Sequence, residues 1–381
     1  MTRSTAPSLV FLRALVRGSA ERLAPVAASV DGGTTLPGWR LRVLDGNHLP
    51  ASEKRLAPLR GHRGAALPGQ ALVVYDPDSG LVTDLVAGED AHQNERASVA
   101  PLLASAQAGQ LWIADRQFCT RAILQGWDAV HAGFVVREHA GHPRLLGHGG
   151  WRECGRTETG QVREQAIEVA GATSPLSASL TSRRGIASRW RRIELALDRP
   201  TEAGETAIRL WSNLPEEISA GQIAALYRTR WRIEGMFQRL ESVLHSEIRS
   251  LGHPRAALLG FAAAVLAYNV LALLQRCVEQ AHSERTPPPE VSTYHLAVHV
   301  RGGYEGMLIA LPPEQWPSYE GNPTALAERL LQLARNINPR QVATSKREPK
   351  ITKPKNYVEG AIARTHVSTA RVLAQARTAT P

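Results

Sequence analysis

Short apolar runs separated by turn residues predict the first strands of the chain. Runs rich in Val and Leu lie at 39–44, 71–75 and 81–87, and an Asp-Pro-Asp-Ser-Gly turn at 76–80 joins the last two into a hairpin. Farther along, the pattern predicts strands over 111–114 and 133–137 and helices over 91–106 and 118–126. Three strands followed by alternating helix and strand indicate a mixed α/β sheet.

The stretches before and after this predicted sheet have other patterns of polar and apolar residues. A helix is predicted over 8–24, and from 138 to 214 polar and apolar residues alternate with frequent Gly and Thr, which predicts a β-rich stretch. A capping box at 219–222 then predicts one long helix that continues to about 250. After a Gly-His-Pro stop, a second helix is predicted over 255–278.

The net charge of the chain indicates which classes of partner it favours. It carries 45 Lys and Arg against 35 Asp and Glu, a net charge of +10. Such an excess favours polyanions such as nucleic acid or an anionic membrane surface. Three widely spaced cysteines, Cys119, Cys154 and Cys277, support neither a disulfide framework nor a cysteine zinc site, so we expect a cytoplasmic protein.

One apolar segment leaves a second class of protein open. Residues 256–274 carry no charge and are long enough to span a membrane. The segment is rich in Ala and Gly and includes Tyr268 and Asn269, which favours a helix buried in a large domain and no membrane partner. A single-span membrane protein is the alternative, and solubility without detergent would exclude it.

The predicted long helix carries a polar face with mixed chemistry. Its members are three or four residues apart and therefore share one side of the helix: Tyr227, Arg230, Glu234, Gln238 and Glu241. A carboxylate between an aromatic hydroxyl and arginines suits an approach to a phosphate backbone. The alternative is a solvated face with ion pairs such as that of Arg230 with Glu234.

Two aspartates follow predicted strands. Asp45 comes after 39–44, and Asp115 comes after 111–114. Strand ends of α/β sheets are where ligand sites tend to form. With Glu234 the two aspartates could hold divalent metal ions, because Mg²⁺ prefers oxygen ligands. Taken singly, each is also a common turn former.

Three strings resemble the motifs of the DDE transposases encoded by bacterial insertion sequences, in the cut-and-paste group with a large β insertion. Residues 227–234 (Tyr-Arg-Thr-Arg-Trp-Arg-Ile-Glu) are similar to the Tyr-x2-Arg-x3-Glu-x6-Lys signature. Residues 43–49 (Val-Leu-Asp-Gly-Asn-His-Leu) and 112–118 (Trp-Ile-Ala-Asp-Arg-Gln-Phe) resemble the two aspartate motifs. Glu241 stands where the signature has its Lys.

The resemblance implies an α/β fold, a ribonuclease H-like mixed-sheet core interrupted by a β-rich insertion, with a helical C-terminal part. The implied organisation is a helical remnant or linker at 1–37, a first core part at 38–137, the insertion at 138–215, a second core part with the glutamate helix at 216–280, and a C-terminal region with a basic tail at 281–381.

The resemblance also implies the site and its partners. The implied catalytic metal ligands, for two Mg²⁺ or Mn²⁺ ions, are Asp45, Asp115 and Glu234. The DNA-binding residues are Tyr227 and Arg230 by resemblance and, by position alone, Arg116, Arg232 and Arg239. The expected function is strand nicking and strand transfer by a homodimer on double-stranded DNA, with terminal inverted repeats and target DNA as substrates. The alternative is a catalytically inactive or truncated DNA-binding remnant.

Overall fold

The computed structural model describes residues 8–31, 33–141, 143–170, 188–316, 321–344 and 366–378. Its framework is a ten-stranded sheet with the strand order β4-β3-β1-β5-β6-β11-β10-β9-β7, in which β8 also pairs with β9. The first five strands are β1 (Arg40–His48), β3 (Gln70–Asp76), β4 (Leu81–Gly88), β5 (Gln110–Ala114) and β6 (Gly133–Arg137). The other five are β7 (Leu145–His148), β8 (Arg152–Thr157), β9 (Gly160–Val169), β10 (Ser188–Leu197) and β11 (Ala207–Ser212).

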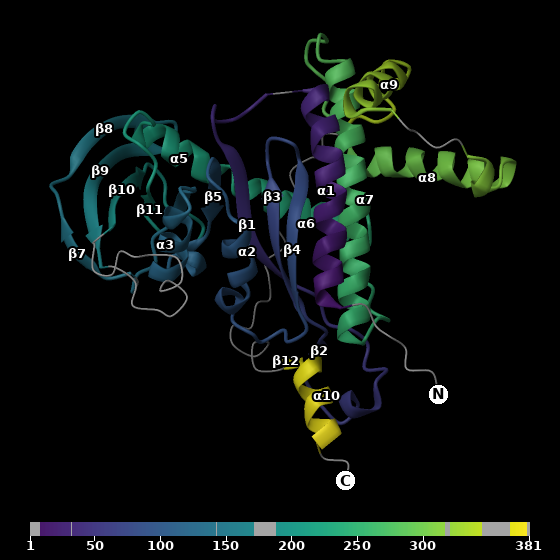
Figure 1. Cartoon of the computed structure of the whole chain (residues 1–381), viewed down its shortest axis with the longest axis horizontal. Helices are drawn as coiled ribbons and strands as arrows, with labels where there is room; N and C mark the ends of the chain where they lie inside the picture. Colours follow the sequence, from purple (N-terminus) through teal and green to yellow (C-terminus); the bar gives the residue numbers. More distant parts are fainter. Residues whose placement is uncertain are drawn as a thin grey trace.

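Strand direction identifies the core of this sheet. β1, β5 and β6 are parallel neighbours, whereas β3 and β4 extend the sheet antiparallel on the far side of β1. Three antiparallel strands followed by two parallel ones form a ribonuclease H-like mixed α/β core, as the sequence predicts. The strands of the β-rich stretch at 138–215 continue the same sheet, because β11 pairs antiparallel with β6. They curve away from the core in Figure 1.

Helices cover both faces of the core strands. The helices are α1 (Leu9–Val30), α2 (Ala100–Ser105), α3 (Arg121–Ala129), α5 (Ala220–Arg228), α6 (Trp231–Ser242), α7 (Pro254–Ala281), α8 (Thr293–Ala310), α9 (Pro323–Arg335) and α10 (Thr369–Thr378). Successive side chains of β5 point to opposite faces of the sheet. Leu111 and Ile113 pack with the helix layer of α1, α5, α6 and α7, whereas Trp112 and Ala114 pack with the layer of α2 and α3. Short 3-10 helices are η1 (Ala57–Leu59), η2 (Glu95–Ser98), η3 (Arg116–Phe118) and η4 (Pro313–Gln315), and β2 (Ala65–Leu67) pairs with β12 (His366–Ser368).

Several predicted helix limits are wrong. The N-terminal helix extends to Val30 and buries Leu12 and Val16 in the main core, so it forms part of the covering layer. The helix predicted over 91–106 is η2 followed by the short α2, with a proline in the first turn of α2. The helix predicted over 118–126 begins only after η3, at Arg121. Within the C-terminal region, residues 345–365 of the basic tail lie outside the described residues.

The predicted long helix is two helices. α5 ends at Arg228 and α6 begins at Trp231. Across the junction, the backbone N–H of Arg230 donates to the carbonyl of Tyr227 at 3.1 Å, and that of Ile233 donates to the carbonyl of Arg230 at 3.1 Å. These bonds span three residues instead of four and tighten the chain locally.

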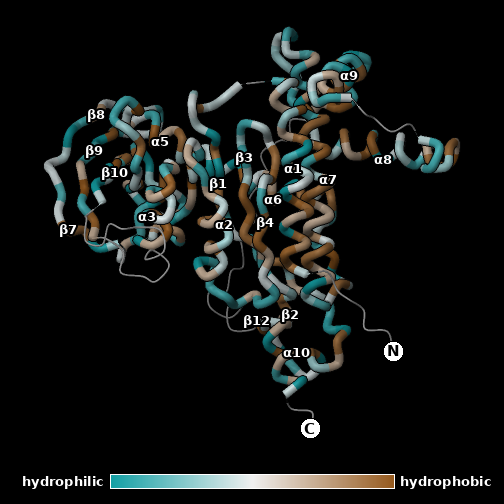
Figure 2. The backbone as a smooth tube through the Cα atoms, viewed as in Figure 1, coloured by the Kyte–Doolittle hydropathy of each residue, from teal (hydrophilic) through white to brown (hydrophobic). Residues whose placement is uncertain are grey.

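α7 explains the apolar segment of the sequence. Among the described residues, it is the one helix that is both long enough and apolar enough to cross a membrane. Half of its most apolar window is buried inside the protein. It lies beside α1 against β4 (Figure 1), and Figure 2 shows the hydrophobic residues of both helices. The fully buried Asn269 side chain accepts from the Val82 N–H at 2.8 Å and donates to the Val82 carbonyl at 2.9 Å. It thereby satisfies backbone groups of the edge strand β4.

Candidate active site

Asp45 and Asp115 lie at the same edge of the core sheet. β1 and β5 are parallel, and their register pairs Leu44 with Ala114, so the aspartates that follow these residues are neighbours. The Asp45 side chain accepts from the Gly46 N–H at 3.0 Å. Asp115 follows β5 and caps η3, accepting from the Gln117 N–H at 2.8 Å. The two predicted aspartates therefore lie together, as the strand pattern indicates.

Glu234 reaches this edge through Arg230. One guanidinium nitrogen of Arg230 donates to Oδ2 of Asp45 at 2.9 Å, and the other donates to Oε1 of Glu234 at 2.8 Å. Arg230 lies in the tightened turn and is the N-cap residue of α6, so the turn positions the bridge. The ion pair of Arg230 with Glu234 that periodicity alone suggests is present, and it includes a third residue from β1.

The aspartate under this bridge has an unusual environment. Burial raises the pKa of Asp45 to about 6; the positive charge of Arg230 opposes the rise, and the negative charges of Asp115 and Glu95 add to it. Burial likewise raises the pKa of Tyr227; the positive charge of Arg230 opposes this rise, and the negative charge of Asp115 adds to it. These mutual effects indicate that the side chains lie close together and are partly desolvated.

Glu95 is a fourth carboxylate that the sequence analysis did not single out. It begins η2, and burial followed by the charge of Asp115 raises its pKa. Its carboxyl lies over Gly46, where a Cβ would come within 2.5 Å of the Glu95 Cδ and 2.9 Å of Oε2. No motif marks position 95, and only the fold brings η2 against the residue that follows Asp45.

The other predicted DNA-binding residues spread over two neighbouring surfaces. Tyr227 is buried, and the guanidinium of Arg230 lies 5.2 Å from the ring centre of the exposed Trp231. Arg116 is exposed and forms an ion pair with Glu205 at 3.4 Å. Arg232 and Arg239 line a separate cavity of about 610 Å³ between α6, α7 and the β3–β4 turn. These two arginines therefore do not converge on the carboxylates.

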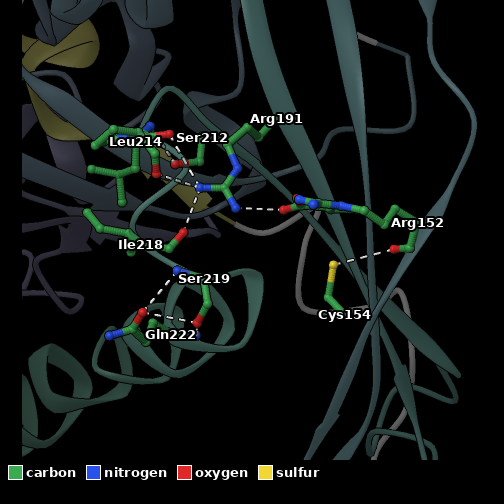
Figure 3. A network of polar contacts seen from close by, with 10 residues as sticks. Arg152, Cys154, Arg191, Ser212, Leu214, Ile218, Ser219 and Gln222 are labelled. Atoms are coloured by element: carbon green, nitrogen blue, oxygen red, sulfur yellow. Dashed lines mark hydrogen bonds and ion pairs between the residues drawn. The ribbon is translucent and has the colours of Figure 1, made fainter.

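A buried ionic network fixes the loop before α5. Arg191 on β10 donates to the carbonyls of Pro215 at 2.8 Å and Ile218 at 2.7 Å, and to Oε2 of Glu164 at 2.6 Å. Figure 3 shows this guanidinium between the loop and strands β8–β10, with the Ser219–Gln222 capping box next to it. The β-rich strands therefore anchor the start of the α5–α6 unit that carries Arg230.

The donor chemistry of the carboxylates suits a hard cation. Asp45, Asp115, Glu95 and Glu234 supply only oxygen ligands, which Mg²⁺ and Mn²⁺ prefer. Within the described ranges, no group of three or more His, Cys, Asp or Glu side chains is arranged to hold a metal ion. Arg230 takes the place of a cation between Asp45 and Glu234, so metal binding at both carboxylates requires this guanidinium to move.

Comparison with known proteins identifies the family of the chain. The family model described as "Transposase DDE domain" matches residues 39–270. Two relatives from Escherichia coli are each 30% identical over 261 residues: a protein described as transposase InsL for insertion sequence element IS186A, from strain K12, and one described as the transposase for insertion sequence element IS421. The alignments cover 61% of this chain, and the chain spans 64% of the length of these relatives. Because the matched region covers more than half of the chain, the chain belongs to the family of transposase DDE domain proteins.

Proposed function

We propose that this chain is an insertion-sequence transposase that nicks double-stranded DNA at terminal inverted repeats and transfers the released strand to target DNA. The observation that carries the proposal is the Arg230 bridge, which joins Glu234 on α6 to Asp45 on β1. Three acidic positions far apart in the chain thus belong to one sheet edge, which suits phosphoryl transfer. The relatives described as transposases support the same activity.

Asp45, Asp115 and Glu234 would hold two Mg²⁺ or Mn²⁺ ions, which supply Lewis acidity toward the scissile phosphate and lower the pKa of a bound water. The protein groups around them orient the DNA. Tyr227 and Arg230 offer a hydroxyl and a guanidinium next to the carboxylates, and a guanidinium binds phosphate oxygens in bidentate fashion. A backbone phosphate can therefore compete with Asp45 and Glu234 for Arg230.

The released 3′ hydroxyl would then attack target DNA without a covalent protein–DNA intermediate, and two copies of the chain would act on paired ends. Arg116 lies near the sheet edge, next to Asp115, and is exposed enough to contact a phosphate. Arg232 and Arg239 would contact DNA on the neighbouring face of α6. A cytoplasmic location follows from a DNA substrate in a bacterial cell.

Substitution of Glu234 by Gln tests the proposal. We expect Mg²⁺-dependent nicking of a DNA end to fall by at least about a hundredfold, because one carboxylate charge is lost, while binding to the same DNA persists. Glu241→Gln, on the exposed side of the same helix, is the matched control and should keep its nicking activity. Full nicking by Glu234→Gln would refute the mechanism.

A DNA-binding protein without catalysis is the second candidate, and the observation that favours it is Glu241 at the position of the signature Lys. Nicking of a supercoiled plasmid separates the two. Relaxed plasmid that appears with Mg²⁺ or Mn²⁺ and disappears with EDTA supports the enzyme. Plasmid that is shifted in a gel but stays supercoiled supports the remnant.

A further inference from the structure

A cavity of about 610 Å³ lies between α6, α7, the β3–β4 turn and the start of α8. The four carboxylates of the candidate active site are not among the residues that line it. Helix α6 therefore contributes to two places, because it carries Glu234 on one face and lines this cavity with another. Ligand pockets commonly have volumes of about 300–1,000 Å³, so this α6–α7 cavity can hold a molecule as large as a nucleotide.

Positive charge predominates on the walls of the α6–α7 cavity. Arg232 and Arg239 of α6 and Arg276 of α7 line it, together with the carboxylates of Glu279 and Glu290. Arg276 is already in an ion pair. Arg232 and Arg239 form no ion pair with any residue that the structure describes, so both guanidinium groups are available for an anion. A guanidinium matches the oxygens of a phosphate group in bidentate fashion.

A glycine separates these two arginines on α6. Arg232, Gly235 and Arg239 are three and four residues apart and therefore share one face of the helix. Gly235 lines the cavity, and a Cβ at this position would meet nothing within 4 Å. Glycine in the interior of a helix is destabilising relative to alanine, and it is common where a backbone comes close to a ligand. Gly235 thus leaves room for an anion between the two guanidinium groups.

Two buried tyrosines also line the cavity, Tyr75 on β3 and Tyr268 on α7. Burial raises the pKa of both hydroxyls, and the positive charge of Arg239 opposes the rise at each of them. Arg239 therefore lies close enough to the two hydroxyls to bind the same ligand with them. At neutral pH both hydroxyls keep their protons and can donate hydrogen bonds to a phosphate oxygen.

The cavity also lies at the N-terminus of α8, which begins beside α7 (Figure 1). Residues 291–294 line it, and Ser292 is the N-cap of this 18-residue helix, which has no acidic residue in its first turn. The first turn of a helix presents unpaired N–H groups and a partial positive charge, which favour an anion. The ring of Tyr294 is 56% exposed and offers a planar face on which a base can stack.

We propose that the α6–α7 cavity binds a single nucleotide, with its phosphate between Arg232 and Arg239 and its base against Tyr294. The same chemistry occurs in a free nucleotide and in a nucleotide of a DNA strand. For a DNA strand the proposal rests on the proposed function and specifies how the two arginines contact DNA, whereas for a free nucleotide it is independent of that function. Either ligand would lie on α6, the helix that carries Glu234.

Isothermal titration calorimetry of the full chain in EDTA and low salt tests the proposal. One probe is thymidine 5′-monophosphate, and the other is single-stranded octathymidylate. We expect a dissociation constant of about 10–500 µM for the mononucleotide, and Arg239→Gln should weaken binding at least about tenfold, because the phosphate loses a charged donor. Arg228→Gln is the matched control. It removes the same charge from a side chain that is 54% exposed on α5 and should leave binding unchanged.

Filling the cavity tests the site without changing its charge. Gly235→Leu places an apolar side chain in the space between the two arginines and should also weaken binding at least about tenfold. Gly18→Leu, on α1, is its control, because a Cβ there likewise meets nothing within 4 Å and Gly18 does not line the cavity. Circular dichroism checks that the variants stay folded.

The two probes distinguish the sources of the nucleotide. Binding of both probes, weakened by Arg239→Gln and by Gly235→Leu, assigns the cavity to a free nucleotide, and binding of octathymidylate alone with the same weakening assigns it to a DNA strand. Absence of binding by both probes, no effect of Gly235→Leu, or equal losses in Arg228→Gln and Arg239→Gln would overturn the proposal. The titration involves neither metal nor nicking, so failure of the proposed transposase activity would not change its result.

Discussion

Arg230 and Asp45 form an ion pair of 2.9 Å, although 185 residues separate them in the chain. Arg230 donates equally closely to Glu234, at 2.8 Å. A cation therefore already lies between two of the three carboxylates proposed to bind metal. The guanidinium can leave only if another positive charge replaces it, or if a phosphate draws it away.

Replacing Arg230 by Gln should make cation binding easier without DNA. The Arg230 guanidinium lies within ion-pair distance of Asp45 and Glu234, and its positive charge repels a metal cation at the same carboxylates. Its loss should therefore tighten Mn²⁺ binding about tenfold at pH 8. Titration followed by electron paramagnetic resonance measures this affinity. Arg232→Gln, an exposed arginine in the same helix, is the control. Unchanged Mn²⁺ affinity would show that Arg230 does not compete with the metal, and we expect DNA binding to weaken in the same variant.

Asp45 should make the free protein less stable as pH rises. Burial raises the pKa of Asp45 in the folded protein to about 6, above the value of about 4 in an unfolded chain. Between these values the folded state keeps a proton that the unfolded state has lost, so the free energy of unfolding decreases as pH rises through this window. Asp45→Asn cannot ionise and should gain about 1–3 kcal/mol relative to the native chain between pH 4 and pH 7.

Urea unfolding in EDTA at several pH values measures the Asp45 effect. The difference between the two proteins should be smallest near pH 4 and largest above pH 6. A difference that is constant across this range would mean that Asp45 is ionised throughout.

Substitutions at Gly46 and Glu95 should have coupled effects on nicking. A Cβ at position 46 would come within 2.9 Å of the Glu95 Oε2, so Gly46→Ala must displace this carboxyl from its place beside Asp45. We expect nicking to fall about tenfold or more, since small misplacements in a site are costly. Glu95→Ala makes room, so the double variant should be no slower than Glu95→Ala alone. Independent, multiplying losses would contradict the coupling, and Gly61→Ala, where a Cβ meets nothing within 4 Å, is the control.

Arg191 should matter for stability and for the site together. Arg191→Met leaves the carbonyls of Pro215 and Ile218 and the carboxylate of Glu164 without this donor, and loss of one partner from a buried ionic network costs about 3–5 kcal/mol. Chemical denaturation measures the loss. Arg189→Met, on the same strand but 77% exposed, should change stability by less than about 0.5 kcal/mol. Equal losses of stability in the two variants would show that the Arg191 network has no special role.

Asn269 distinguishes a core helix from a membrane span. Asn269→Leu makes α7 more apolar but leaves the Val82 N–H and carbonyl without their partners. A core helix should therefore lose about 2–4 kcal/mol of stability, as two buried backbone groups become unsatisfied. Ala263→Leu, at an exposed position of the same helix, is the control. Native chain that stays in solution without detergent and a destabilised Asn269→Leu agree with the core role; a chain that needs detergent would contradict it.

The sequence alone determined the features that depend on local pattern. Short apolar runs located the strands at 39–44 and 111–114, and ligand sites tend to form where the strands of such sheets end, so Asp45 and Asp115 could be selected together. The predicted end of the first strand was wrong, because β1 continues past Asp45 to His48. The Tyr-x2-Arg-x3-Glu string located Glu234. These features can be read from the sequence because side-chain periodicity and short motifs depend on neighbours within a few residues.

Only the tertiary structure decided how distant segments meet. The break between α5 and α6 does not follow from periodicity, because each half has a helical pattern and the tightened turn is held by packing and by the Arg230 bridge. Glu95 joins the site because η2 lies over Gly46. The β-rich strands continue the core sheet because β11 pairs with β6. Such contacts link residues tens to hundreds of positions apart, and their energies depend on the whole packed arrangement instead of on local sequence.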